Sequence, residues 1–273
     1  MSARLGAVAG APRLEAESLV VLRIIDTVLF DLDDTLHDDT AAYRTAAGLV
    51  AADVARDHAV DPAAVLRAYV AQAQAFWSNL SAEHLAAGIV DTRAQMWYDS
   101  LRSVGIDDSA LAERCAVDYV RYRADVLTLF PGARACIDGL RARGCRLGIV
   151  TNGFAATHHD KIARLGLTPL FDALFIADEM GMVKPDPAVF RHACDVLGSV
   201  PERTAMVGDR YDRDIVGAQR CGLFTVLVDV HAHPIPAAAT PPDAVVARIA
   251  DVLSVLPLGE AEGAHRLSQK GKH

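Results

Sequence analysis

Short runs of apolar, largely β-branched residues recur along the chain, and stretches with the spacing of amphipathic helices separate them. In the first run, Asp26 to Asp31, the apolar residues are continuous instead of alternating, as in a strand buried on both faces of a parallel sheet. Similar runs follow at 146–151, 172–177, 204–208 and 224–229. Strands that alternate with helices predict an α/β fold built on a parallel sheet.

Residues that favour helix ends mark the helices between these strands. Pro131 begins one helix and Gly144 ends it. Asp186 can cap the next long helix, with Pro187 at its first position and Gly198 at its end. The remaining pattern predicts two further helices, at 214–222 and 241–256.

One long segment breaks the alternation of strands and helices. From about Thr40 to Leu129 the sequence shows only alanine-rich helical patterns, with breaks near 60–62, 88 and 105–108. A segment of this length exceeds any ordinary crossover between parallel strands, so it predicts an inserted helical domain. The expected organisation is an N-terminal extension at 1–21, a core at 22–38 and 127–256, a helical insertion at 39–126 and a tail at 257–273, both ends being disordered.

Composition narrows the class of protein. The chain of 273 residues is 52% hydrophobic, and 27 basic against 35 acidic residues give a net charge of −8. This balance gives no attraction to nucleic acid or anionic lipid, and no apolar run reaches the roughly 18 residues of a membrane span. The five scattered cysteines form no C-x-x-C pair, which favours buried free thiols and a cytoplasmic location. The first eleven residues make a poor signal peptide.

Polar residues follow the predicted strands at the edge where ligands gather in parallel sheets. Asp31 and Asp33 follow the first strand, Thr151 and Asn152 end the second, Lys184 lies in the loop after the third, and Asp209 and Asp214 follow the fourth. Two like charges about 4 Å apart repel by roughly 4 kcal/mol at an effective dielectric near 20, so converging carboxylates need a cation, or some of them must be protonated. Oxygen ligands without nearby His or Cys suit Mg²⁺, and Lys184 adds a charge for a phosphate.

These four motifs, in this order, resemble the haloacid dehalogenase-like (HAD) superfamily. They read Asp31-Leu-Asp33-Asp-Thr35, Thr151, Lys184, and Gly208-Asp209 to Asp214. The resemblance covers roughly Asp26 to Val230 and implies a Rossmann-like, three-layer core. The helical insertion is similar to the cap of the C1 class.

The resemblance also implies roles for these residues. Asp31 would be the nucleophile that forms an aspartyl-phosphate, and Asp33 the general acid and base. The Asp31 and Asp209 carboxylates and the Asp33 carbonyl would bind Mg²⁺, and Asp214 would hold metal-bound water. Thr151 and the Asn152 amide would bind phosphoryl oxygens, and Lys184 would neutralise charge. The dehalogenases of the family lack the Asp33 acid and the metal.

Several nearby residues have ordinary structural interpretations. Asp34 and Thr35 are expected to stabilise the turn locally. Arg210 is expected to form a surface salt bridge, and Asp212 to be solvated. We expect His158 and His159 on the surface, and core aromatic positions in the helical insertion for Trp77, His84, Trp97 and Tyr98.

The sequence thus predicts a Mg²⁺-dependent phosphatase, a monomer or homodimer, that acts on a small phosphorylated metabolite such as a sugar phosphate or nucleotide. Val150-Thr-Asn-Gly153 and the segment 206–215 are most similar to the acylneuraminate-phosphatase and pyrimidine-nucleotidase branch. Three alternatives stay open on the same fold: a 2-haloacid dehalogenase, a phosphotransferase (mutase), and a non-catalytic binding or regulatory protein.

Overall fold

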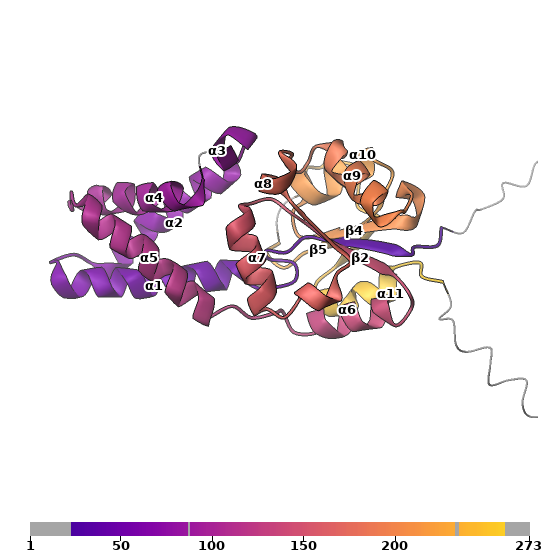
Figure 1. Ribbon diagram of the computed structural model, residues 1–273, viewed down its shortest axis with the longest axis horizontal. Coiled ribbons are helices and arrows are strands. Elements are labelled where there is room, and N and C mark those ends of the chain that lie inside the picture. The colour runs from indigo at the N-terminus through magenta and orange to yellow at the C-terminus, as the bar shows by residue number, and fades with distance from the viewer. Residues whose placement is uncertain (1–22, 87, 233–234, 260–273) are drawn as a thin grey trace, which may run out of the picture.

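The structure is a computed structural model that describes residues 23–86, 88–232 and 235–259. Its centre is a six-stranded sheet in the order β3-β2-β1-β4-β5-β6, in which every neighbouring pair is parallel (Figure 1). The strands are β1 (Thr27–Phe30), β2 (Arg146–Thr151), β3 (Ala173–Ile176), β4 (Thr204–Gly208), β5 (Phe224–Val228) and β6 (Ala244–Val246). The predicted parallel α/β fold is confirmed. The extension predicted at 1–21 and most of the tail lie outside the described residues.

Helices cover both faces of the sheet, which explains the continuous apolar runs in its strands. All four residues of β1 are buried. On one face pack α6 (Ala133–Arg141), α7 (Ala155–Arg164) and α11 (Val252–Val255). On the other face pack α9 (Pro187–Leu197) and α10 (Val216–Arg220), so the core has three layers (Figure 1).

The strand order reverses beside β1, and this reversal positions the polar residues. The chain runs from β1 through β2 to β3 on one side, and then crosses to β4 on the other side of β1. In the β1–β4 pair, Phe30 lies opposite Val207. Asp31 and Asp209, which follow these two residues closely, therefore leave the sheet side by side at the point where α/β folds bind ligands.

The helix predicted at 241–256 is wrong in its first half, where the chain forms β6 instead. Asp243 accepts hydrogen bonds of 2.8 Å from both the backbone N–H and the hydroxyl of Thr225, and so aligns β6 beside β5. A 3-10 turn, Ile249–Asp251, then leads into α11. The helix predicted at 214–222 begins two residues later as α10, after a π-helical turn at Tyr211–Ile215.

The helix predicted from Asp186, Pro187 and Gly198 is confirmed as α9. The Asp186 carboxylate accepts a hydrogen bond from the backbone N–H of Ala188 at the N-terminus. Gly198 ends the helix with φ at 61°, a conformation that glycine adopts without steric cost.

The first five of the six described helices between β1 and β2 form what we call the helical segment. They are α1 (Asp39–Asp57), α2 (Pro62–Ser78), α3 (Ala82–Ala86), α4 (Ile89–Ser103) and α5 (Ser109–Asp125), so the helices break near the three predicted positions and at one further place, 79–81, that the sequence pattern does not predict. The segment has a hydrophobic cluster of its own, in which Trp97 is fully buried and stacks on Tyr69 with ring centroids 4.1 Å apart. Figure 1 shows it extending from one end of the sheet.

The two chain connections between the sheet and the helical segment are bonded to each other. The Phe130 N–H donates to the Leu36 carbonyl at 3.0 Å, and His37 forms a β-bridge with Leu129. A second contact, around Leu85 and Phe154, joins the helical segment to the loop after β2.

All five cysteines are free thiols, and four of them are buried, as predicted. Among the described residues, no helix is long and apolar enough to cross a membrane.

Candidate active site

Three aspartates form a buried cluster at the carboxyl ends of β1 and β4. One carboxylate oxygen from each of Asp31, Asp209 and Asp214 lies within 4.8 Å of the other two. Their exposed fractions are only 7%, 5% and 1%. The structure therefore brings together three of the acids that the sequence singles out.

Lys184 points into this cluster. Its Nζ lies 2.6 Å from Asp31 Oδ1 and 2.6 Å from Asp214 Oδ1, and it donates to the Val150 carbonyl at 2.7 Å. The side-chain amide of Asn152 fixes the backbone of Lys184 on both sides: it donates to the Lys184 carbonyl at 2.9 Å and accepts from the Lys184 N–H at 2.8 Å. The loop after β3 is thus attached to the end of β2.

The cluster carries more negative charge than Lys184 balances. Burial raises the pKa of Asp31 to about 7, in part offset by Lys184, and Asp214 raises it further. Burial, followed by the charges of Asp31 and Asp214, holds the pKa of Asp209 well above its usual range. Burial alone would lower the pKa of Lys184, but the carboxylates of Asp214 and Asp31 raise it. A set of buried oxygen ligands with surplus negative charge fits a hard divalent cation such as Mg²⁺.

The chain after β4 brings Asp214 back to the cluster. The Arg210 N–H donates to Asp214 Oδ2 at 3.0 Å across the π-helical turn. Gly208 leaves the necessary room, because a Cβ there would lie 2.3 Å from the same carboxylate oxygen. The Thr35 hydroxyl donates to Asp209 Oδ1 at 3.3 Å, so the prediction of a purely local bond for Thr35 is wrong.

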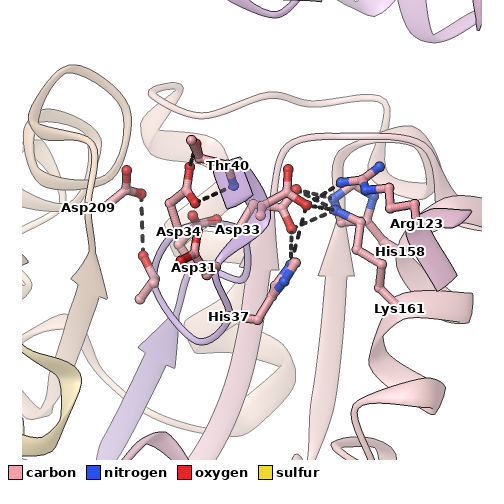
Figure 2. A network of polar contacts seen from close by, with 12 residues as sticks. Asp31, Asp33, Asp34, His37, Thr40, Arg123, His158, Lys161 and Asp209 are labelled. Atoms are coloured by element: carbon pink, nitrogen blue, oxygen red, sulfur yellow. Dashed lines mark hydrogen bonds and ion pairs between the residues drawn. The ribbon is translucent and has the colours of Figure 1, made fainter. Parts of the chain in front are cut away.

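Asp33 lies outside this cluster, among basic side chains. Lys161 Nζ donates to both of its carboxylate oxygens at 2.6 Å, and His37 Nε2 lies 2.8 Å from Oδ1. His158 Nε2 is 3.5 Å from Oδ2. Burial alone would raise the pKa of Asp33, but Lys161 foremost, then His158 and His37, hold it well below its usual range. Figure 2 shows these groups around Asp33.

This basic group continues into the helical segment. Lys161 Nζ also lies 3.2 Å from Asp39 Oδ1, and Asp39 forms an ion pair with Arg123 of α5. Asp33 is thereby linked to both the first and the last helix of the segment. Asp34 instead accepts hydrogen bonds from the Thr40 N–H and hydroxyl, which confirms its predicted role in the turn (Figure 2).

Sequence reasoning missed the partners of Asp33. The prediction that His158 lies on the surface is wrong, because its exposed fraction is 2% and it faces Asp33. Its neighbour His159 is exposed and lies 2.8 Å from Glu179, as expected of a surface residue. The sequence motifs also give no role to Lys161. The available signal was helical spacing, because His158 and Lys161 fall on the buried face of α7 together with Ile162.

A cavity of about 380 Å³ opens above the aspartates, between the sheet and the helical segment. Thr151 and Asn152 line it from the core, and Trp77 lines it from α2. The core positions predicted for four aromatic residues of the helical segment hold for three of them: Trp97 is a core residue, and Tyr98 and Trp77 pack against that core half-buried, with Trp77 also lining the cavity. His84 is exposed, so its predicted core position is wrong.

Arg210 and Asp212, next to the cluster in sequence, behave as predicted. The Arg210 guanidinium forms an ion pair with the exposed carboxylate of Asp212 at 3.1 Å. Neither side chain bonds to the three clustered aspartates, although the Arg210 backbone does.

Known proteins resemble this chain in sequence and in fold over most of its length. The glyceraldehyde 3-phosphate phosphatase of Methanopyrus kandleri is 32% identical over 213 residues, which are 75% of this chain and 84% of that protein. The N-acylneuraminate-9-phosphatase of Rattus norvegicus is 30% identical over 80% of this chain and 87% of its own. Among solved structures, the HAD-hydrolase YfnB of Bacillus subtilis, bound to magnesium, superimposes with a TM-score of 0.69 at 24% identity, over 85% of this chain and 99% of that one.

A family model gives the assignment directly. The model described as haloacid dehalogenase-like hydrolase matches residues 25–222, a range that runs from before β1 to after α10. It therefore includes all three clustered aspartates, Lys184 and the whole helical segment. The chain belongs to the haloacid dehalogenase-like hydrolase family.

Proposed function

We propose that the protein is a Mg²⁺-dependent phosphatase that hydrolyses a small phosphomonoester through an aspartyl-phosphate on Asp31. The observation that carries the proposal is the contact between Asp31 and Lys184, 2.6 Å apart and buried beside Asp209 and Asp214. A carboxylate nucleophile next to a fixed cation and a metal-binding pair suits an incoming phosphate dianion. The relatives named as phosphatases support the same reaction class.

The chain's own residues would position the phosphate. In this proposal the free oxygen of Asp31 faces phosphorus, while Lys184 neutralises charge on both carboxylate and phosphate. The Thr151 hydroxyl and the Asn152 backbone amide, both in residues that line the cavity, donate to phosphoryl oxygens. Because these donors are fixed before the substrate binds, they stabilise the transition state without reorganisation.

The residues that would hold Mg²⁺ are the Asp31 and Asp209 carboxylates and the Asp33 carbonyl, with Asp214 binding through water. When bound, the cation supplies charge stabilisation to the transferring phosphoryl group. Thr35 orients Asp209, and the turn after β4 orients Asp214, by the hydrogen bonds described above.

Asp33 would move the protons. In the first step the Asp31–phosphorus bond forms, the ester P–O bond breaks, and the departing alkoxide takes a proton from Asp33. In the second step water attacks phosphorus, gives a proton to Asp33, and the Asp31–phosphorus bond breaks. Lys161, His158 and His37 fix the position of Asp33 at the cavity and hold it ionised in the free protein, which is the form that accepts a proton from water; the first step therefore requires these contacts to rearrange when the substrate binds.

The helical segment would act as a cap that closes the cavity and selects the substrate. We propose that the cap spans residues 39–126 and the catalytic core 22–38 and 127–256. A cavity of about 380 Å³ suits a small metabolite better than a phosphoprotein. A monomer or homodimer in the cytoplasm, with free buried thiols, completes the proposal.

Oxygen-18 water separates this proposal from its main rival, a 2-haloacid dehalogenase. In a single turnover with excess enzyme, water that attacks phosphorus leaves ¹⁸O in inorganic phosphate and none in Asp31. Ester hydrolysis in a dehalogenase would place ¹⁸O in the Asp31 carboxylate, detectable by peptide mass spectrometry. We expect p-nitrophenyl phosphate hydrolysis with Mg²⁺, ¹⁸O only in phosphate, and loss of turnover in Asp31→Asn.

Other outcomes would contradict the proposal. Chloride release from a 2-haloacid without metal would identify a dehalogenase. Conversion of a sugar phosphate to its isomer, without free phosphate, would identify a mutase. An Asp31→Asn variant with full phosphatase activity would exclude Asp31 as the nucleophile.

A further inference from the structure

The wall that the helical segment contributes to the cavity is basic, although the chain as a whole carries a net charge of −8. Within the described ranges, this wall has three arginines, Arg44, Arg93 and Arg123, and one carboxylate, Asp39. Asp39 is already shared by Arg123 and Lys161. The far side of the cavity from the aspartate cluster therefore has a surplus of positive charge.

Two arginines of this wall, Arg44 and Arg93, form no ion pair within the described residues. Arg93, on α4, is the more buried of the two. It is half-buried, and no carboxylate in the part of the chain that the structure describes forms an ion pair with it. Its guanidinium lies 5.6 Å from the ring centroid of Tyr119. Burial lowers the pKa of Arg93, Tyr69 and Tyr119 offset this only in part, and the nearby Arg123 lowers it further, so no carboxylate in the described ranges compensates the guanidinium.

Tyr69 adds a neutral donor on the same wall. Its side chain is 3% exposed, lines the cavity and packs against Tyr119 with ring centroids 5.3 Å apart. Burial raises the pKa of Tyr69 well above its usual range, so its hydroxyl keeps its proton at neutral pH. A guanidinium and a phenol beside each other are donors suited to an anion.

We propose that Arg93 is a specificity residue that binds a carboxylate of the substrate, at the end remote from the phosphate. This inference rests on the proposed phosphatase function. A substrate of this class carries two anionic groups: a phosphate ester at the Asp31 end of the cavity and a carboxylate at the α4 end. A planar guanidinium pairs with a carboxylate through two parallel hydrogen bonds, which gives direction as well as charge.

A single monovalent carboxylate matches this wall better than a second phosphate does. A phosphate dianion at the α4 end would need more than one free cation there, but Arg123 is held by Asp39, and Arg44 is exposed and lies on α1. A neutral hydroxyl would leave the Arg93 charge uncompensated in a half-buried position, which is unfavourable. The cavity that holds Asp31 also holds Arg93, so one molecule can contact both ends.

Matched substrate pairs test the proposal on the full-length enzyme with Mg²⁺. Three pairs differ only at the carbon remote from phosphate: 3-phosphoglycerate and glycerol 3-phosphate, 4-phosphoerythronate and erythritol 4-phosphate, and 6-phosphogluconate and glucitol 6-phosphate. For the pair whose length fits the cavity, we expect kcat/KM to favour the acid by roughly 10- to 100-fold, the effect of a hydrogen bond between charged groups. In Arg93→Met the ratio should fall towards one, mainly through KM, and Arg93→Lys should keep part of it.

Arg102 provides a matched control on the same helix. Its guanidinium also lies 5.6 Å from a tyrosine ring centroid, that of Tyr98, but Arg102 is exposed and does not line the cavity. Arg102→Met should therefore keep the wild-type ratio. An equal loss in Arg102→Met and Arg93→Met would attribute the effect to general loss of charge and overturn the proposal.

The experiment separates failure of this inference from failure of the phosphatase function. If the wild-type enzyme hydrolyses p-nitrophenyl phosphate but treats acids and alcohols alike in all three pairs, the carboxylate site is refuted and the phosphatase stands. If it hydrolyses neither p-nitrophenyl phosphate nor any of the six esters, the proposed function itself is refuted. If Arg93→Met does not fold, the ratio in the wild type and in Arg93→Lys still decides.

Discussion

Removal of divalent cations should make the stability of the protein depend strongly on pH between about 4 and 7. In the metal-free cluster the pKa of Asp31 is raised from 3.8 to about 7. The folded protein therefore keeps a proton that the unfolded chain has lost, and the free energy of unfolding falls as pH rises through this window. At about 1.36 kcal/mol for each pKa unit, the loss is roughly 4 kcal/mol once pH 7 is reached.

Thermal unfolding with a chelator and with excess Mg²⁺, from pH 5 to pH 8, measures this effect. With the chelator, we expect the melting temperature to fall by roughly 5 to 10 °C across the range, since roughly 2.6 kcal/mol of the loss falls between pH 5 and pH 8 and 1 kcal/mol corresponds to about 2 to 4 °C for a chain of this size. Bound Mg²⁺ compensates the carboxylates and should reduce the slope. Asp31→Asn should flatten the curve recorded with the chelator.

The low pKa of Asp33 does not obscure this result. A lowered acid pKa contributes stability that is present above about pH 4 and is lost only as pH falls further, outside the measured range. Burial lowers the pKa of His158, which adds stability as pH rises through the same window and so opposes the effect of Asp31. The decisive quantity is therefore the difference between the wild type and Asp31→Asn, both of which keep His158, and metal-free curves that coincide between pH 5 and pH 7 would refute the reasoning.

Three substitutions test other parts of the structure. Lys161→Met leaves Asp33 and Asp39 without their shared cation, and should lower the free energy of unfolding in urea by about 2 kcal/mol. Gly208→Ala pushes a Cβ against Asp214 and should reduce kcat/KM roughly 100-fold, whereas Gly48→Ala, where the nearest atom is 3.9 Å away, should not. Trp97→Ala leaves a cavity in the core of the helical segment and should lower the free energy of unfolding, measured by calorimetry, by about 3–5 kcal/mol. For Lys161→Met, Gly208→Ala and Trp97→Ala, a value equal to that of the wild type would contradict the expectation.

The strands of the core were predictable because burial on both faces leaves a continuous apolar run. The ranges at 146–151 and 204–208 match β2 and β4 residue for residue. β6 escaped prediction because it has only three residues, and its alignment depends on the distant contact between Asp243 and Thr225. The residues of this stretch have the spacing of a helix, and the contact with Thr225 that makes them a strand cannot be read from the local sequence.

The candidate site was predictable where its residues follow strands, and not where helices supply them. Asp31 and Asp209 follow neighbouring strands directly, so the strand order alone brings them together. Lys161 and His158 reach Asp33 from the buried face of α7, and Arg123 reaches Asp39 from α5. Those contacts depend on how the helices pack, which a single sequence does not specify.

The bonded pair of connections at Leu36–His37 and Leu129–Phe130 limits how the helical segment can turn relative to the sheet. Two independent linkers would allow twisting as well as bending, but a hydrogen bond and a β-bridge join these two linkers, so we expect them to move together as one hinge. His37 belongs to this hinge and also contacts Asp33 at 2.8 Å. Any rotation about the hinge therefore moves a side chain that contacts Asp33, the residue to which we assign proton transfer.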